Sequence, residues 1–214
     1  MAPSTDFAFV SPSRNLGPAE KRTAYATARA AIRAVLGPAD GELVRMVTVN
    51  CLLKTYLPYF YWVGFYLVEG ASAAQLAPLP QPLSTGEGSR PLVVTSERNN
   101  RSQEENTAKR RLVVGPYQGT LGCLYIDFGR GVCGSVAASG VPKIVPDTHA
   151  LEQGKEHIAC DPNSRSEIVL PVRRGDGSLL GVFDVDSSLV GSFDGVDREE
   201  LEGLLEETFA SGRQ

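Results

Sequence analysis

The fold of this chain is decided by the stretch from Glu167 to Asp186, EIVLPVRRGDGSLLGVFDVD. Two apolar runs, 167–172 and 179–186, flank the polar segment 173–178. The dipeptide Asp176-Gly177 inside that segment is a strong signal for a tight hairpin turn. We therefore predict two antiparallel strands joined by this turn.

Three carboxylates fall on one face of the predicted hairpin. Asp184 and Asp186 alternate with apolar residues, so both point to the same side of their strand. A turn centred on residues 175–176 places Glu167 opposite Asp184, and one centred on 176–177 places it opposite Asp186. Both registers gather the three acids, which then need a cation, a shared proton or a metal ion. Two interpretations stay open: oxygen ligands for a divalent cation, or a pocket for an organic cation and a protonated acid.

A cysteine lies just before the first of these strands, in the polar stretch 157–167. Cys160 stands in a turn-rich loop followed directly by a rigid strand, which is a suitable place for a reactive thiol. Cys123 and Cys133 occur ten residues apart in a glycine-rich segment. Four cysteines in 214 residues do not form a disulfide framework, so free, catalytic or metal-binding thiols are expected.

A thiol beside an acidic pocket suits the reduction of a sulfoxide. The thiol attacks the sulfoxide sulfur, a protonated acid delivers a proton to the oxygen, and carboxylates stabilise the positive charge that builds on sulfur. The enzyme is left with a sulfenic acid, which a second thiol condenses to a disulfide. Both Cys123 and Cys133 are available for that step. The cysteine spacing is poor for a structural zinc site, and a cysteine hydrolase would have only His149 and His157 as its base.

The remaining elements indicate an α+β domain. Helices are predicted over residues 18–36, from a cap at Asp40 to about Tyr56, over 135–139 and over 194–210. Besides the hairpin, strands are predicted over 59–68 and 143–145. Helices at both ends with antiparallel strands between them favour one sheet with helices on a face.

Two apolar patterns raise the question of what they pack against. In the strand 59–68, alternation puts Trp62 and Tyr66 on one face and Tyr61 on the other. The first pair is either a core layer or the wall of a small-molecule pocket. On the second helix, Leu43, Val47 and Cys51 recur at helical spacing, and we expect Cys51 to pack in the core.

Composition and charge narrow the class of protein. A net charge of −4 and 42% hydrophobic residues are ordinary for a soluble globular protein, and the mild acidity argues against a nucleic-acid surface. We expect a cytoplasmic protein without a membrane anchor, because no signal peptide is apparent and the longest apolar run is too short to span a bilayer. Residues 70–110, rich in proline and polar residues, are predicted to be a surface insertion in one domain over 18–210, with tails at 1–17 and 211–214.

These motifs resemble one family, the free methionine-(R)-sulfoxide reductases, which are single GAF-domain enzymes. The resemblance covers about residues 40–209. Besides Cys123, it is carried by Tyr61–Tyr66, Gly115–Gly119, Gly129–Gly134, Val145–Asp147, His157–Asp161, Ser166–Val169 and Gly181–Ser187. The chain departs from the family at Tyr61, where asparagine is frequent, and in the long insertion after Glu69.

The resemblance implies a GAF-like, six-stranded antiparallel sheet flanked by helices. It also implies Cys160 as nucleophile, Cys123 as the main resolving thiol and Cys133 as a further partner. The residues implied for the substrate pocket are Trp62, Tyr66, Glu167, Asp184 and Asp186, with Glu167 also acting in catalysis. No metal or cofactor is implied. The implied partners are free methionine-(R)-sulfoxide and a thioredoxin-type reductant, and a homodimer is compatible with the family. The alternative function is a ligand-sensing GAF module without chemistry, which needs the pocket but not three placed cysteines.

Overall fold

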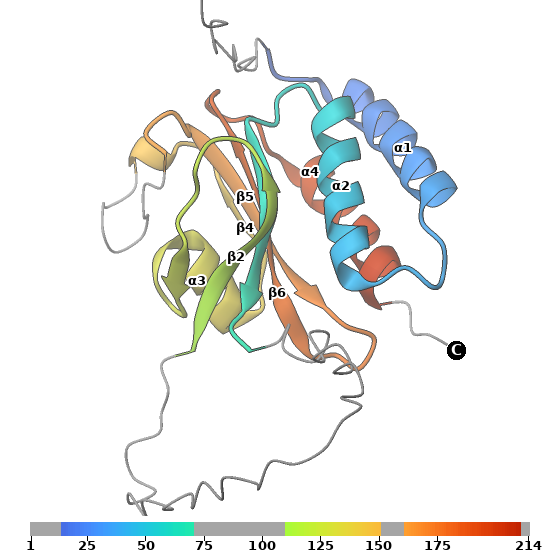
Figure 1. Cartoon of the computed structure of the whole chain (residues 1–214). Helices are drawn as coiled ribbons and strands as arrows, with labels where there is room; N and C mark the ends of the chain where they lie inside the picture. The colour runs from blue at the N-terminus through green and yellow to red at the C-terminus, as the bar shows by residue number, and fades with distance from the viewer. Residues whose placement is uncertain (1–13, 71–109, 151–160, 211–214) are drawn as a thin grey trace, which may run out of the picture.

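The computed structural model describes residues 14–70, 110–150 and 161–210 (Figure 1). Most of the predicted insertion, together with His157 and Cys160, lies outside these ranges. In the part of the chain that is described, no helix is long and apolar enough to cross a membrane.

The described residues form a single six-stranded sheet. Its order is β3-β2-β1-β6-β5-β4, and every neighbouring pair is antiparallel. The strands are β1 (Trp62–Val68), β2 (Arg111–Gln118), β3 (Tyr125–Asp127), β4 (Lys143–Val145), β5 (Ser166–Arg173) and β6 (Leu179–Ser187). The predicted α+β class with a six-stranded antiparallel sheet is therefore confirmed.

Helices cover both faces of this sheet. Figure 1 shows the helices labelled α1, α2 and α4 together on one side and α3 on the other. The helices are α1 (Pro18–Val35), α2 (Glu42–Tyr56), α3 (Gly131–Ser139) and α4 (Gly195–Leu205), and α4 continues as a π-helical turn over Glu206–Ala210. A short 3-10 turn, Thr148–Ala150, follows β4.

The predicted helix at 135–139 begins four residues earlier than expected, at Gly131. Its early turns are glycine-rich, which lowers intrinsic helix propensity and makes the segment look like a loop. Close packing explains the glycine at 134, because a Cβ atom there would lie 2.2 Å from the Asp127 carbonyl oxygen. As a result, Cys133 lies on a helix rather than in a loop.

The second helix also corrects two predictions. Its N-cap is Gly41, and the Asp40 carboxylate instead accepts a hydrogen bond from the Gly37 N–H at 2.7 Å. Cys51 is exposed rather than packed in the core, as are Leu43 and Val47 on the same stripe. Apolar residues occur all around this helix, so periodicity alone does not select its inner face. The buried stripe consists of Met46, Val49, Asn50 and Leu53.

The main hydrophobic core lies between the sheet and the helices α1, α2 and α4. It includes Tyr25 and Ile32 from α1, Phe65 from β1 and Phe183 from β6. A second apolar cluster lies on the opposite face, under α3, and contains Trp62, Tyr66, Val169 and Val182 among others. The sheet therefore separates a well-filled core from the face that carries the candidate site.

The hairpin adopts the second of the two predicted registers. Glu167 pairs with Asp186, and Val169 pairs with Asp184. In the turn, Gly177 has a φ of 81°, a left-handed conformation that favours glycine, and the Asp176 carboxylate accepts from the Ser178 N–H at 2.9 Å. The turn chemistry thus selects the register that gathers the acids on one face.

Candidate active site

Three central strands bring the predicted site residues into neighbouring rows. Across β1, β6 and β5, one row reads Trp62, Asp186, Glu167 and the next reads Gly64, Asp184, Val169. Paired residues point to the same face of a sheet, so the indole and the three carboxylates share the face that α3 covers. The sequence prediction that the three acids share one face of the hairpin is therefore confirmed.

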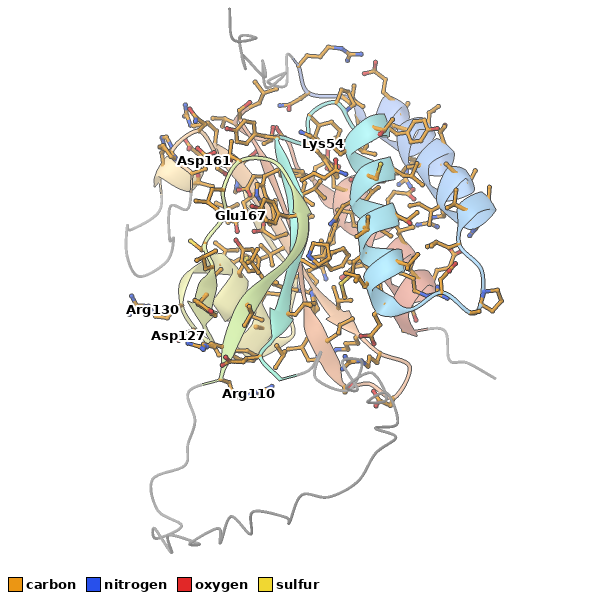
Figure 2. The ribbon with its side chains drawn as sticks, in the orientation of Figure 1. Lys54, Arg110, Asp127, Arg130, Asp161 and Glu167 are labelled. Carbon is orange, nitrogen blue, oxygen red and sulfur yellow. The ribbon has the colours of Figure 1, made fainter. Side chains whose placement is uncertain are left out.

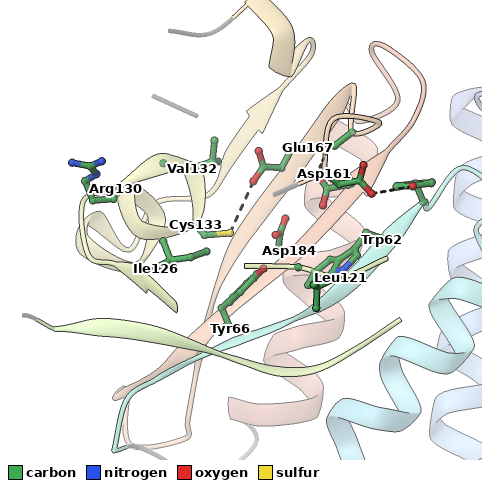
Figure 3. A pocket seen from close by; sticks show the side chains of 15 residues that line it. Trp62, Tyr66, Leu121, Ile126, Arg130, Val132, Cys133, Asp161, Glu167 and Asp184 are labelled. Atoms are coloured by element: carbon green, nitrogen blue, oxygen red, sulfur yellow. Dashed lines mark hydrogen bonds between the residues drawn. The ribbon is translucent and has the colours of Figure 1, made fainter. Parts of the chain in front are cut away.

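A pocket of about 560 Å³, open on one side, lies on this face (Figure 3). Figure 3 shows Cys133, Glu167 and Asp184 converging in it, while Arg130 extends away from it. The lining residues are Tyr61, Trp62, Tyr66, Leu121, Gly122, Ile126, Arg130, Gly131, Val132, Cys133, Asp161, Ser164, Glu167, Asp184 and Asp186. Six predicted site residues thus line one cavity, namely Trp62, Tyr66, Cys133, Glu167, Asp184 and Asp186.

Tyr61 also lines the pocket, although alternation along the strand predicted the opposite face. The strand begins only at Trp62, and Tyr61 belongs to the bend before it. The period of two does not apply across such a bend, so its side chain joins Trp62 on the pocket face.

The aromatic wall of the pocket is held rigidly. The Trp62 ring stacks between Tyr66 and Tyr117, with centroid distances of 5.7 and 5.3 Å. Its indole N–H donates to the Thr120 carbonyl at 3.0 Å. Gly64 makes room for this arrangement, because a Cβ atom there would lie 2.6 Å from the indole ring. The wall therefore presents a fixed apolar surface to a small ligand.

The acids lie at different depths beside this wall. Glu167 and Asp184 are only 5% and 6% exposed, and one oxygen of Asp184, Oδ1, has no hydrogen-bond partner among the described residues. Burial, and then the charges of the neighbouring acids, raises the pKa of both carboxyls well above their usual range, while Lys143 opposes the shift of Glu167.

Asp186 lies nearer the pocket mouth. Burial raises the pKa of Asp186 to about 7, and the Ser164 hydroxyl, which donates to it, opposes this rise. Burial thus favours the protonated forms of Glu167 and Asp184, which can act as acids, and Asp186 is close to its own pKa at neutral pH.

The described cysteines are in different states. Cys133 is buried and free, its sulfur is 4.0 Å from Glu167 Oε1, and burial followed by the charge of Asp184 raises the pKa of its thiol. Cys123 is disulfide-bonded, and Cys51 is a free thiol on the outer face of α2. Cys160 lies outside the described residues, so its predicted place beside the acids stays a prediction.

A metal ion is the other occupant considered for the acids. The Cys133 sulfur and one oxygen each of Glu167 and Asp184 all lie within 4.8 Å of one another. This spacing would let them share a cation, but burial raises the pKa of each of the three, so each holds its proton more tightly than usual and a cation would have to compete with that proton. The same groups can instead stay protonated and donate hydrogen bonds to an organic ligand.

Sequence reasoning missed two polar side chains of the site. Asp161 accepts hydrogen bonds from the Tyr61 hydroxyl at 3.0 Å and from the Thr120 hydroxyl. Ser164 binds Asp186. Their position directly after Cys160 was the available signal, but polar residues in a turn-rich loop are usually solvated, and only the packed structure shows their partners.

Comparisons with known proteins place these features in context. A family model described as GAF domain matches residues 96–208, more than half of the chain. A free methionine-R-sulfoxide reductase from Saccharomyces cerevisiae is 46% identical over 103 residues, which cover 48% of this chain and 53% of the yeast protein. The Escherichia coli protein of the same name is 29% identical over 181 residues, covering 85% of this chain and 84% of its own length.

A solved structure extends the likeness to three dimensions. It is the X-ray structure of free methionine-R-sulfoxide reductase from Neisseria meningitidis in complex with its substrate. Its TM-score is 0.60 at 29% identity, and the match covers 91% of this chain and 89% of that chain.

Proposed function

Because this chain belongs to the GAF domain family and its relatives include free methionine-R-sulfoxide reductases, we propose that it reduces free L-methionine-(R)-sulfoxide to L-methionine. The observation that carries the proposal is the pocket itself. It combines buried carboxyl groups, whose protonated forms are favoured by burial, with a rigid aromatic wall. A sulfoxide needs this combination, because its oxygen must be protonated while positive charge develops on its sulfur.

Each part of the substrate has a complementary part of the pocket. The methyl and methylene groups pack against Trp62 and Tyr66, which present stacked aromatic faces. The ammonium group and the developing sulfonium charge favour the ionised forms of Asp184 and Asp186, which attract these charges once the substrate is bound. Glu167, which is deeper and has a raised pKa, supplies the proton to the sulfoxide oxygen. A methionine sulfoxide within a protein lacks the free ammonium and carries peptide bonds on both sides, so it binds poorly.

The thiol chemistry proceeds in two steps. The Cys160 sulfur attacks the sulfoxide sulfur, the oxygen passes to Cys160, and methionine leaves with a Cys160 sulfenic acid remaining. The Cys123 thiol then condenses with that sulfenic acid, which forms a Cys123–Cys160 disulfide and releases water. An external dithiol of the thioredoxin type reduces the disulfide and restores both thiols. We further propose that the enzyme acts in the cytoplasm, where such reductants are available.

The states of the described cysteines support this ranking of the resolving thiols. Cys123 is disulfide-bonded, so it is a residue that can pair, whereas Cys133 is a free and deeply buried thiol. A buried thiol with a raised pKa is a poor nucleophile but a suitable neutral neighbour for a carboxyl group. Cys133 therefore acts first as part of the pocket and only second as a partner for disulfide exchange.

The nucleophile is tested with purified Cys160→Ser protein, free methionine-(R)-sulfoxide and dithiothreitol. We expect turnover to be abolished, because a serine hydroxyl does not form the sulfenic acid. The matched control is Cys51→Ser, on the exposed face of α2, which should retain wild-type turnover. Full activity in Cys160→Ser would contradict the mechanism. A wild-type protein that binds the sulfoxide without turning it over would be a ligand-sensing module instead.

The resolving step is tested with Cys123→Ser. In a single round this variant should still form about one methionine per enzyme, because the first step needs only Cys160. Repeated turnover with thioredoxin should collapse. Normal thioredoxin-driven turnover would instead make Cys133 the resolving partner. The double variant Cys123→Ser/Cys133→Ser would then lose thioredoxin-driven turnover.

A further inference from the structure

The most densely hydrogen-bonded carboxylate at the pocket belongs to Asp161. Its Oδ2 accepts from the Tyr61 hydroxyl at 3.0 Å and from the Thr120 hydroxyl. Its Oδ1 accepts from the backbone N–H of Asn163 at 2.8 Å and from the Asn163 side-chain amide at 3.0 Å. Four donors on one carboxylate leave little capacity for a ligand, so Asp161 is better suited to hold protein segments together.

These bonds join three segments that are far apart in the sequence. Asp161 directly follows Cys160, and Thr120 lies three residues before Cys123. The Thr120 carbonyl also accepts from the Trp62 indole, which fixes this residue from its other side.

Helix α2 also holds Tyr61 in place. The Lys54 ammonium donates to the Tyr61 carbonyl at 2.8 Å, and Figure 2 shows Lys54 and Asp161 toward the same end of the sheet, away from Arg110.

We propose that Asp161, Tyr61 and Thr120 form a clasp that positions the segments bearing Cys160 and Cys123 for disulfide formation. The inference rests on the proposed function, since it concerns the step in which the Cys123 thiol condenses with the Cys160 sulfenic acid and releases water. Holding two reacting groups in position converts their encounter into a reaction between neighbouring atoms, which accelerates it. In this proposal Asp161, Tyr61 and Thr120 act as positioning residues.

The charge on Asp161 suits this role. Burial acts to raise its pKa, but the hydrogen bonds from Thr120, Asn163 and Tyr61 outweigh it and lower the pKa below the usual range. The carboxylate therefore stays ionised at neutral pH, and hydrogen bonds to an ionised acceptor are the stronger kind. This contrasts with Asp184, whose Oδ1 lacks a partner among the described residues.

The decisive variant is Thr120→Val, which removes one hydroxyl donor outside the pocket lining. The matched control is Thr55→Val on α2, whose hydroxyl bonds only the Cys51 carbonyl among the described contacts. One equivalent of free methionine-(R)-sulfoxide is mixed with reduced protein. Methionine release, sulfenic acid trapped by dimedone and loss of free thiols are then followed separately.

In Thr120→Val we expect methionine release within about twofold of wild type, but disulfide formation slower by about tenfold, with trapped sulfenic acid accumulating. Thr120→Ser should restore the wild-type rate, because it returns the hydroxyl. A merely structural defect would slow both steps together and would not respond selectively to the hydroxyl.

A second measurement needs no substrate. In a glutathione redox buffer, Thr120→Val and Tyr61→Phe should each make the disulfide easier to reduce, by about tenfold in its equilibrium constant, equivalent to about 30 mV. A wild-type equilibrium constant for disulfide reduction in both variants would overturn the clasp proposal. If the wild type failed to reduce the sulfoxide, the proposed function would fall, and this titration would still decide whether the clasp favours the disulfide.

Discussion

Buried acids lie on opposite faces of the same sheet, and they differ in how many hydrogen-bond donors surround them. On the face covered by α1, α2 and α4, Asp197 is fully buried and accepts hydrogen bonds from the Lys21 ammonium, the Tyr25 hydroxyl at 2.9 Å and the Tyr59 hydroxyl. The Asp194 N–H donates to it as well, at 2.8 Å. Every part of this carboxylate is matched by a donor, and one of those donors carries a positive charge.

On the pocket face the acids are not matched in this way. No ion pair between described residues involves Asp184 or Asp186, and Asp184 Oδ1 is buried without a hydrogen-bond partner among those residues. Burial, and then the charges of the neighbouring acids, raises the pKa of Glu167 and Asp184, so these groups do not stabilise the fold as Asp197 does. The difference teaches that the acid with a full set of donors ties α1 to α4, whereas the under-satisfied acids are available to a ligand.

The largest effect on stability is expected at Asp197, the carboxylate whose two oxygens both have hydrogen-bond donors. Lys21→Met leaves the Asp197 carboxylate buried without its cation, which should lower the free energy of unfolding by about 3–5 kcal/mol. Urea denaturation measures the change. Arg22→Met is the control, because its partners Glu199 and Glu200 form exposed pairs worth less than about 1 kcal/mol. An equally small loss for Lys21→Met would remove the distinction between the two groups.

The pocket acids should show the opposite balance of stability and activity. Asp184→Asn should lower kcat/KM for free methionine-(R)-sulfoxide by about 10²-fold, because a group that stabilises the developing charge is lost. Its free energy of unfolding should stay within about 1 kcal/mol of wild type, because asparagine keeps the size and shape of the side chain and burial already disfavours the ionised carboxyl in the free protein. Kinetics and urea denaturation on the same preparation test both. The exposed hairpin variant Asp176→Asn should change neither, and a destabilised but active Asp184→Asn would reverse the assignment.

The pH dependence of stability offers a third distinction. The pKa of Asp186 is about 7 in the folded chain, against about 3.9 in an unfolded chain. Between these values the unfolded chain releases a proton that the folded chain keeps, so the free energy of unfolding falls as pH rises toward 7 and levels off above it.

Asp186→Asn removes this contribution. Its stability should therefore fall less than that of wild type between about pH 4.5 and about pH 7, as measured by urea denaturation across that range. Asp176→Asn is again the control, because the Ser178 hydroxyl and N–H lower the pKa of Asp176, and its contribution has the opposite sign. Parallel pH profiles for wild type and Asp186→Asn would show that Asp186 ionises normally.

The smallest effect on stability is expected when a single hydrogen-bond donor to Asp197 is removed. Tyr25→Phe deletes one neutral hydroxyl from Asp197 while Lys21 and Tyr59 remain, and it should cost about 1 kcal/mol of unfolding free energy. Tyr56→Phe, at the exposed end of α2, is the matched control and should cost almost nothing. A loss for Tyr25→Phe as large as that for Lys21→Met would mean that the tyrosine, and not the ammonium, compensates the charge.

Local patterns were enough to predict much of the fold and of the site. The hairpin, the shared face of Glu167, Asp184 and Asp186, and the aromatic pair Trp62 and Tyr66 follow from alternation along strands and from the Asp176-Gly177 turn. The helix boundaries at residues 18 and 56 follow from proline, glycine and apolar periodicity. These features depend on neighbours within a few residues, which the sequence displays directly.

The sequence by itself determined the α+β class, the shared face of Glu167, Asp184 and Asp186, and two alternative hairpin registers. The Asp176-Gly177 turn selects one of these registers. The tertiary structure alone decided which stripe of α2 is buried and that Tyr61 turns into the pocket. It also decided that Asp161 binds Tyr61 and Thr120. The physical reason is that each of these outcomes depends on contacts between segments tens of residues apart, whose close approach is set by packing and not by local periodicity.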